Sequence, residues 1–179
     1  RSSIELSDGR ILVAGTNGLV FLKDGKIDAT LSEADGLNNQ YILSMMERDD
    51  GSILAASDGD GIYIIKDNRI VGHKGKEEGL GSAVVLRIVK CTEGYLYVTS
   101  NAIYYDDGKS IKLLDDFYSN NYDIIIKDGR CWISSSAGLY VGDEKDLKEN
   151  NSTEFTLMDE SWGLTSSLNS NSWNYLDIS

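Results

Sequence analysis

Apolar runs and turn residues alternate along the chain in a pattern that occurs four times. Each copy begins with an acidic residue and a glycine, and a run of four to six aliphatic, β-branched and aromatic residues follows. The copies begin at Asp8-Gly9, Asp50-Gly51, Glu93-Gly94 and Asp128-Gly129. Glycine adopts positive φ at little cost, so each pair predicts a tight hairpin turn. The apolar runs predict strands.

The spacing of the copies predicts the fold. The turn glycines Gly9, Gly51, Gly94 and Gly129 lie 42, 43 and 35 residues apart. Repeats of about 40 residues that contain short strands are typical of propeller blades. Three turns join four short strands in each copy, and helical periodicity is confined to residues 143–150. We therefore expect an all-β fold, a β-propeller with about four blades of four antiparallel strands.

Large and small residues recur at fixed places in the second strand of each copy. Small residues follow in pairs such as Ala14-Gly15 and Ser134-Ser135. The third position after the turn glycine is large each time, and it is occupied by Leu12, Leu54, Tyr97 and Trp132. This position predicts a core between neighbouring blades.

Gly-Leu pairs mark the links between blades. They occur at Gly36-Leu37, Gly79-Leu80 and Gly163-Leu164. The resulting blade units are residues 4–37, 38–80, 81–117 and 118–164, with 165–179 as the start of a further blade. The chain then begins and ends at an inner strand. We expect an arc of a larger propeller, or two chains that complete each other's ring.

The composite repeat resembles the two-component regulator propeller repeat. Residues 36–64 and 79–105 match its full length, and residues 128–141 carry its tryptophan, Trp132. The resemblance implies a sensor in the extracytoplasmic part, periplasmic or on the cell surface, of a bacterial signal transduction protein. A membrane anchor and a histidine kinase or diguanylate cyclase would belong to other segments of that parent protein.

Charge excludes several partners. The chain has 17 Lys and Arg against 29 Asp and Glu, which gives a net charge of −12. Nucleic-acid binding needs clustered cations, and so does docking on an anionic membrane. We expect neither, and a membrane would be met only through parent segments outside this chain. Two cysteines are too few for a disulfide framework.

No pattern in the sequence predicts catalysis. The single histidine, His73, lies in a polar stretch and is expected to be a solvated loop residue, without a second histidine for a metal site or triad. Cys131 occupies an apolar repeat position and predicts a buried thiol. Asp58–Gly61 lacks the further oxygen ligands of a calcium loop and predicts a plain turn. We therefore expect no catalytic residue, metal or cofactor, and no enzyme activity in this segment.

Aromatic residues near the links and inner strands are the candidate ligand contacts. Inner strands line the axis of a propeller, and aromatic faces beside Asn and Asp can hold a small polar ligand such as a carbohydrate. The candidates are Tyr41, Arg87, Tyr122, Trp173 and Tyr175. Packing between blades remains open for the aromatic residues, and pairing with a carboxylate for Arg87. Two other functions also remain open: a propeller-fold glycan lyase or hydrolase, and a scaffold that mediates dimerisation without a ligand.

Overall fold

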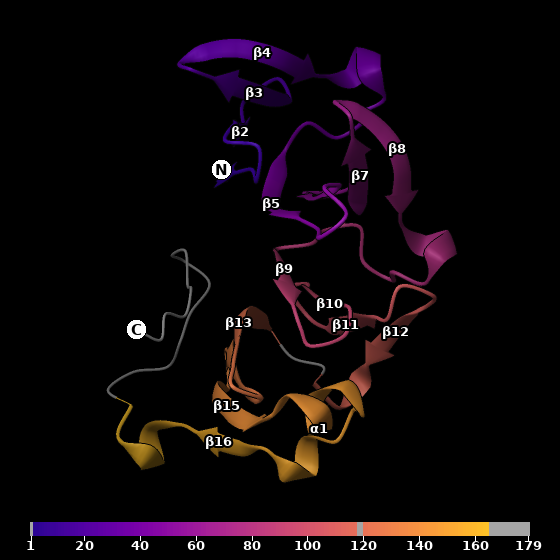
Figure 1. Cartoon of the computed structure of the whole chain (residues 1–179). Helices are drawn as coiled ribbons and strands as arrows, with labels where there is room; N and C mark the ends of the chain where they lie inside the picture. Colours follow the sequence, from indigo (N-terminus) through magenta and orange to yellow (C-terminus); the bar gives the residue numbers. More distant parts are fainter. Residues whose placement is uncertain (1, 118–119, 165–179) are drawn as a thin grey trace. The chain divides into compact units, whose positions relative to one another are not determined.

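Four antiparallel sheets make up the described part of the chain. The computed structural model describes residues 2–117 and 120–164. Within these ranges, each sheet has four strands whose spatial order follows the sequence (Figure 1). The predicted four-stranded antiparallel units are therefore confirmed, and we refer to the sheets as blades 1 to 4. No helix among the described residues is long and apolar enough to cross a membrane.

Blades 1 and 2 share one design, with a hairpin between each pair of successive strands. Blade 1 comprises β1 (Ser3–Glu5), β2 (Ile11–Ala14), β3 (Leu19–Lys23) and β4 (Lys26–Leu31). Blade 2 comprises β5 (Ile42–Glu47), β6 (Ile53–Ser57), β7 (Ile62–Lys66) and β8 (Arg69–Lys74). Short 3-10 turns, η1 (Glu33–Asp35) and η2 (Lys76–Glu78), open the Gly-Leu links.

Blade 4 departs from this design because a helix precedes its outer strand. Blade 3 comprises β9 (Arg87–Lys90), β10 (Tyr95–Val98), β11 (Ile103–Asp106) and β12 (Ile111–Leu114), followed by η3 (Asp115–Phe117). Blade 4 comprises β13 (Asn121–Lys127), β14 (Arg130–Ser135), β15 (Gly138–Asp143), α1 (Glu144–Lys148), η4 (Ser152–Glu154), β16 (Thr156–Met158) and η5 (Glu160–Trp162). Helix α1 confirms the helical periodicity at residues 143–150.

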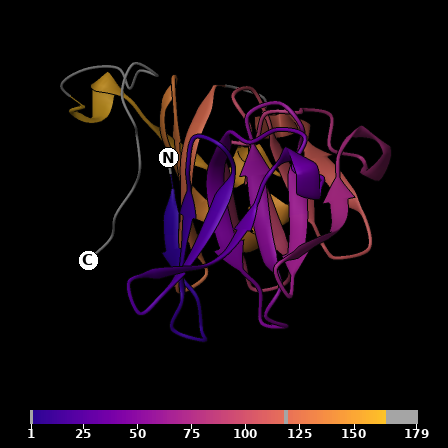
Figure 2. The same ribbon diagram turned by 90° about the horizontal axis from the view of Figure 1, so that it is seen from above.

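The chain divides into two compact units, Arg1–Ile88 and Val89–Ser179. Unit 1 contains blades 1 and 2, which stand side by side in indigo to magenta in Figure 2. One face of blade 1, its back face, packs against one face of blade 2, its front face. The buried residues of this core include Leu12, Ala14, Leu19 and Phe21 from blade 1, and Ile53, Ala55, Tyr63 and Ile65 from blade 2.

Unit 2 has a second core of the same kind. The buried residues include Leu96, Val98, Ile103 and Leu114 from blade 3, and Ile124, Cys131, Ile133 and Leu147 from blade 4. Cys91 lies in this core as well. Both thiols are buried, as predicted for Cys131, and burial raises the pKa of Cys91 to about 11.

The register of blade 3 corrects one sequence prediction. Ala14 pairs with Leu19 at the end of β2, and Val98 pairs with Ile103 at the same place in blade 3. Counting back from these pairs, Leu96 and not Tyr97 is the register equivalent of Leu12, although Tyr97 is fully buried, as predicted for a core residue. The cause is a shorter hairpin, since turn geometry sets the strand register.

Two hydrogen bonds show the shortening. The N–H of Leu6 donates to the carbonyl of Arg10 in blade 1, whereas the N–H of Cys91 donates to the carbonyl of Gly94 in blade 3. The blade 3 hairpin therefore closes one residue earlier.

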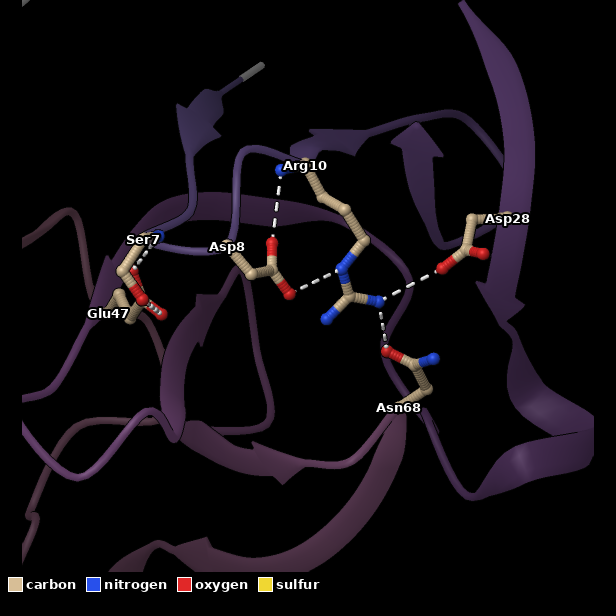
Figure 3. Close-up of polar contacts among 6 residues, drawn as sticks. All are labelled: Ser7, Asp8, Arg10, Asp28, Glu47 and Asn68. Atoms are coloured by element: carbon tan, nitrogen blue, oxygen red, sulfur yellow. Dashed lines mark hydrogen bonds and ion pairs between the residues drawn. The ribbon is translucent and has the colours of Figure 1, made fainter. Parts of the chain in front are cut away.

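The ends of the blades differ in what they carry. We call the end with the first and third hairpins of each blade the turn end, and the opposite end, where the Gly-Leu links run, the link end. At the turn end of unit 1, Ser7 of blade 1 donates to Glu47 of blade 2, from its N–H to Oε2 at 2.7 Å and from its hydroxyl to Oε1 at 2.8 Å (Figure 3).

Arg10 makes a second connection at the turn end. Its guanidinium donates to Asp8 at 2.8 Å and to Asp28 at 3.1 Å within blade 1, and to Asn68 of blade 2 at 2.8 Å (Figure 3). The guanidinium carbon also lies 5.0 Å from the centre of the Phe21 ring. These contacts join two hairpins that are far apart in the sequence.

Candidate functional site

The link end of blade 2 carries a polar cluster built on the loop between β6 and β7. Ala56 pairs with Ile62 in blade 2, whereas Ala14 pairs with Leu19 in blade 1, so the blade 2 loop is one residue longer. Gly61 has a φ of 66°, and a Cβ there would lie 2.3 Å from the carbonyl oxygen of Lys74. Only glycine fits this position without a shift of the backbone.

Ser57 and the following link hold the loop in place. The hydroxyl of Ser57 donates to the carbonyl of Gly61 at 3.0 Å and accepts from the N–H of Asp60 at 2.9 Å. The N–H of Gly61 donates to the carbonyl of Ala83 at 2.8 Å. These bonds fix the loop on both sides, so the position of Asp60 is set by the fold.

Tyr63 connects this loop to the preceding link. Its hydroxyl donates to Oδ2 of Asp60 at 2.5 Å and accepts from the N–H of Asn39 at 2.7 Å. Burial raises the pKa of Tyr63, and the hydrogen bond to the Asp60 carboxylate raises it further. The phenol is therefore a proton donor at neutral pH rather than a charged group.

His73 belongs to the same cluster; it is exposed, as predicted, but it lies in a strand rather than in a loop. It lies in β8, directly opposite Tyr63 in the register, because β8 continues to Lys74. The two rings have centres 5.5 Å apart at an interplanar angle of 59°. Nε2 of His73 contacts the carbonyl oxygen of Asp60 and lies 3.7 Å from the Asp60 carboxylate.

Tyr41 is an exposed residue whose backbone adjoins the cluster. Its N–H donates to Oδ1 of Asn39 at 2.9 Å, and its carbonyl accepts from the N–H of Asp58 at 2.8 Å. The Asn39 side chain also donates to the carbonyl of Asp58 at 2.8 Å. The backbone of Tyr41 is thus fixed, while the residue as a whole is 55% exposed.

The other predicted ligand residues lie elsewhere. Arg87 begins β9 and is half-buried, and the next residue, Ile88, donates its N–H to Oγ of Ser44 at 3.2 Å. Tyr122 is half-buried in β13 of the other unit, in a β-bulge. Trp173 and Tyr175 lie outside the described residues.

Sequence reasoning missed most of the cluster. Asn39, Asp60, Tyr63 and His73 come from a link, a loop and two strands, and no periodic pattern connects them. The one signal in the sequence was the extra residue in Asp58–Gly61, which we interpreted as a plain turn. Tyr63 follows the apolar alternation of a core strand, and this pattern gives no sign of the hydrogen bonds that its hydroxyl makes.

The cluster brings polar groups of different kinds together. The Asp60 carboxylate lies beside the exposed His73 imidazole, and the buried phenol of Tyr63 donates to that carboxylate. In the part of the chain that the structure describes, no group of three or more His, Cys, Asp and Glu residues could hold a metal ion.

A groove at the turn end of unit 2 is a weaker candidate. It has a volume of about 440 Å³ and is lined in part by Thr92, Glu144, Lys145 and Lys148. Glu144 is engaged by Thr92 at 2.6 Å and 2.7 Å, and Lys148 lies 3.3 Å from it. These polar groups hold blades 3 and 4 together, so we assign the groove to that contact.

Solved structures with the same fold include three bacterial surface or extracellular proteins. The extracellular domain of BT3049 from B. thetaiotaomicron, assigned as a hybrid two-component system, matches 93% of this chain with a TM-score of 0.73 and 16% identity. That of BT4673 from the same organism matches 88% at 0.71 and 15%. PorZ, a surface component of the type-IX secretion system of Porphyromonas gingivalis, matches 88% at 0.67 and 13%.

The matches cover a limited part of these proteins. The chain spans 24%, 23% and 22% of the three structures, about a quarter of their length. No family model matches the sequence, and no curated protein matches it. The chain is therefore an all-β propeller segment with the fold of extracellular domains of hybrid two-component systems, which bears out the resemblance of its repeat.

Proposed function

We propose that the chain is a sensory, ligand-binding segment of the extracytoplasmic propeller of a bacterial two-component-type signalling protein. The fold of two extracellular domains of such systems supports this function. Because PorZ has the same fold in a secretion system, fold alone does not decide the function. The parent would carry a membrane anchor and a histidine kinase or diguanylate cyclase.

The observation that carries the proposal is that Tyr41 is exposed while its backbone adjoins a cluster whose members are already fixed. Tyr41 is held through its backbone, and Asp60 is held by its loop and by Tyr63. A binding group that is ordered before the ligand arrives loses little entropy on binding. This arrangement favours a ligand over mere packing between blades as the role of Tyr41.

The ligand would be a small polar molecule such as a carbohydrate. One face of a sugar is apolar enough to stack on the Tyr41 ring, while its hydroxyls reach Asp60 and His73. Arg87 would serve an acidic group on such a ligand. Tyr122, Trp173 and Tyr175 remain proposed contacts.

A thermal-shift screen tests this function. The chain is heated with monosaccharides, oligosaccharides, amino acids and peptides in turn. A ligand at about 100 times its dissociation constant adds about 2.7 kcal/mol to the folded state. At roughly 2–4 °C per kcal/mol for a chain of this size, the midpoint rises by several degrees.

Two variants make the screen specific. Tyr41→Ala should abolish the shift, since it removes the exposed aromatic side chain that would hold the ligand. Val71→Ala, which alters another exposed side chain of blade 2, should keep the shift. A full shift with Tyr41→Ala, or no shift with any class of compound, contradicts the proposal. Turnover of a glycan during the incubation would indicate a lyase or hydrolase instead.

A further inference from the structure

Two cysteines enter the core of unit 2 from opposite sides. The N–H of Cys91 donates to the carbonyl of Gly94, so these residues pair across the hairpin between β9 and β10. Gly94 lies two residues before Leu96, and alternation along the strand places Cys91 on the same face of blade 3 as Leu96. Cys131 belongs to the same core from blade 4. The two thiols therefore lie on the two faces that pack together.

The two cysteines also lie at the same end of their blades. Thr92, the residue after Cys91, donates its N–H and hydroxyl to the Glu144 carboxylate at 2.6 Å and 2.7 Å. The N–H of Glu144 donates to the carbonyl of Gly129 at 2.9 Å, two residues before Cys131. Hydrogen bonds thus connect one cysteine hairpin to the other at the turn end.

Unit 1 shows how close the two positions come. The corresponding residues there are Leu6, whose N–H closes the first hairpin of blade 1, and Ile53, two residues after the turn glycine of blade 2. Both are 4% exposed and belong to one core. Ser7, next to Leu6, binds Glu47, which pairs directly with Ile53. Blade-to-blade packing therefore brings these positions together, and in unit 2 both are thiols.

The thiols share one electrostatic environment. Burial and the Glu144 carboxylate raise the pKa of Cys91 to about 11. Burial also raises the pKa of Cys131, and the charges of Glu144 and Cys91 raise it further. The structure shows the dithiol form, in which Sγ of Cys91 makes a weak bond to the carbonyl of Glu93 at 3.2 Å. A disulfide between thiols of high pKa resists reduction, because each is a poor leaving group.

We propose that Cys91 and Cys131 form a disulfide that fastens blades 3 and 4 together at the turn end in an oxidising compartment. The compartment rests on the proposed function, since extracytoplasmic proteins form and keep disulfides. The two cysteines are 40 residues apart in the sequence, so the bridge closes a long loop. Closing such a loop restricts the unfolded chain and stabilises the fold.

The bridge forms by thiol–disulfide exchange with a small disulfide oxidant such as oxidised glutathione. The thiolate of one cysteine attacks the oxidant and displaces one glutathione thiolate, and the thiolate of the second cysteine then attacks the mixed disulfide and displaces the other. The two cysteine protons pass through solvent to the displaced thiolates, and the two electrons reduce the oxidant to two thiols. Because thiolates are scarce in the closed core, exchange proceeds during folding or transient opening.

Equilibration with glutathione tests the bridge. The reduced chain is held in a mildly alkaline mixture of reduced and oxidised glutathione, once folded and once in concentrated urea. Acid quenching and intact mass spectrometry then measure the fraction that has lost two hydrogen atoms. Fold and bridge stabilise each other by the same factor, so the equilibrium constant for the bridge should be about a hundredfold larger in the folded chain. The bridged chain should also unfold at a higher urea concentration than the dithiol form.

The matched control moves one thiol by two residues. Cys91→Ala with Glu93→Cys keeps two cysteines in the chain but places one of them at an exposed position of the same hairpin. Its equilibrium constant should be nearly the same in the folded chain and in urea. Circular dichroism verifies that the variant is folded.

Three results would overturn the proposal. One is an equilibrium constant no larger in the folded chain than in urea, which would show that the core holds the thiols apart. Another is a control variant that forms the bridge as readily as the native chain. The last is a bridge found only between two chains. The measurement needs no ligand, so a missing bridge leaves the thermal-shift result untouched, and a missing thermal shift leaves the bridge untouched.

Discussion

The two units tie their blades together at the turn end with the same contact, drawn from different elements. In unit 1 the acceptor is Glu47, the last residue of β5, which takes the N–H and hydroxyl of Ser7. In unit 2 it is Glu144, the first residue of α1, which takes the N–H and hydroxyl of Thr92 at 2.6 Å and 2.7 Å. In both units, therefore, a carboxylate accepts two hydrogen bonds from one hairpin residue, although the two carboxylates occupy different positions in the repeat.

Both units also place a cation over an aromatic ring, and again the cation comes from a different element in each unit. Phe21 and Tyr105 occupy equivalent positions, since they pair with Leu12 and Leu96. Arg10 lies over Phe21 in unit 1, and Lys148 of α1 lies 5.9 Å from the centre of the Tyr105 ring. In unit 2 the helix thus supplies both the carboxylate and the cation, whereas unit 1 divides them between two blades.

The environments of the two carboxylates differ. Glu144 is 4% exposed, whereas Glu47 remains partly exposed. Burial alone would raise the pKa of Glu144, but hydrogen bonds from Thr92 and Lys148 outweigh it, and the pKa lies below its ordinary value. Hydrogen bonds to charged groups contribute more where water competes less. Unit 2 should depend more strongly on its carboxylate than unit 1 does.

The largest loss should follow removal of the aromatic ring in unit 1. Phe21→Ala empties a fully buried site and should lower the free energy of unfolding by about 3–5 kcal/mol. Urea unfolding followed by far-UV circular dichroism measures it. Tyr105→Ala is the matched change in unit 2, where the ring is only half-buried, and it should cost less. Equal losses would show that the two ring sites are not energetically different.

The next largest effect should come from the buried carboxylate. Glu144→Ala leaves Lys148 and the Thr92 donors without their acceptor and should cost about 3 kcal/mol. All three tryptophans of the chain lie in unit 2, so their fluorescence during urea unfolding reports this loss. Lys145→Ala, at an exposed position of the same helix, is the control. A loss below about 1 kcal/mol would mean that the helix adds little to the hairpin contact.

Part of this effect should disappear in acid. The lowered pKa of Glu144 means that its stabilising contribution is fully present above the ordinary value of 4.5 and declines as the pH falls through the lower folded value. The difference in unfolding free energy between the native chain and Glu144→Gln should therefore shrink below about pH 4.5. Urea midpoints between pH 7 and pH 3 measure it. A difference that stays constant down to pH 3 would refute the assignment.

The smallest effect should come from the equivalent carboxylate of unit 1. Glu47→Ala removes two hydrogen bonds near solvent and should cost about 1 kcal/mol. Its partner change, Ser7→Ala, should cost less, since the N–H of Ser7 is retained. The two changes together should cost less than their sum in urea unfolding, because they remove one shared contact. Strict additivity would exclude direct coupling between these two side chains.

The turn residues allowed the blades to be predicted, whereas the register between paired strands could not be predicted from them. Asp128-Gly129 predicts a two-residue hairpin, and both residues have positive φ in the structure, at 52° and 76°. The register of blade 3 could not be read in this way, because Gly94 does not reveal that its hairpin is shorter. A shift of one residue places Tyr97, which is still fully buried, on the opposite face of the sheet from the equivalent of Leu12.

The candidate site was predictable only in part. Tyr41 could be proposed because it stands beside a link and an inner strand. The bonds of Tyr63 to Asp60 and Asn39 depend on how a link folds back over a loop, which no local pattern specifies. The roles of the acceptors Glu47 and Glu144 could not be predicted for a similar reason, since each lies 40 or more residues from its donor.

The two thiols, Cys91 and Cys131, make local unfolding in the second half of the chain measurable. Both are buried, both have a raised pKa, and the chain holds no other cysteine. Alkylating reagents attack the thiolate, which is scarce under these conditions. Modification by iodoacetamide should thus follow the transient opening of blades 3 and 4, while opening confined to blades 1 and 2 leaves no trace.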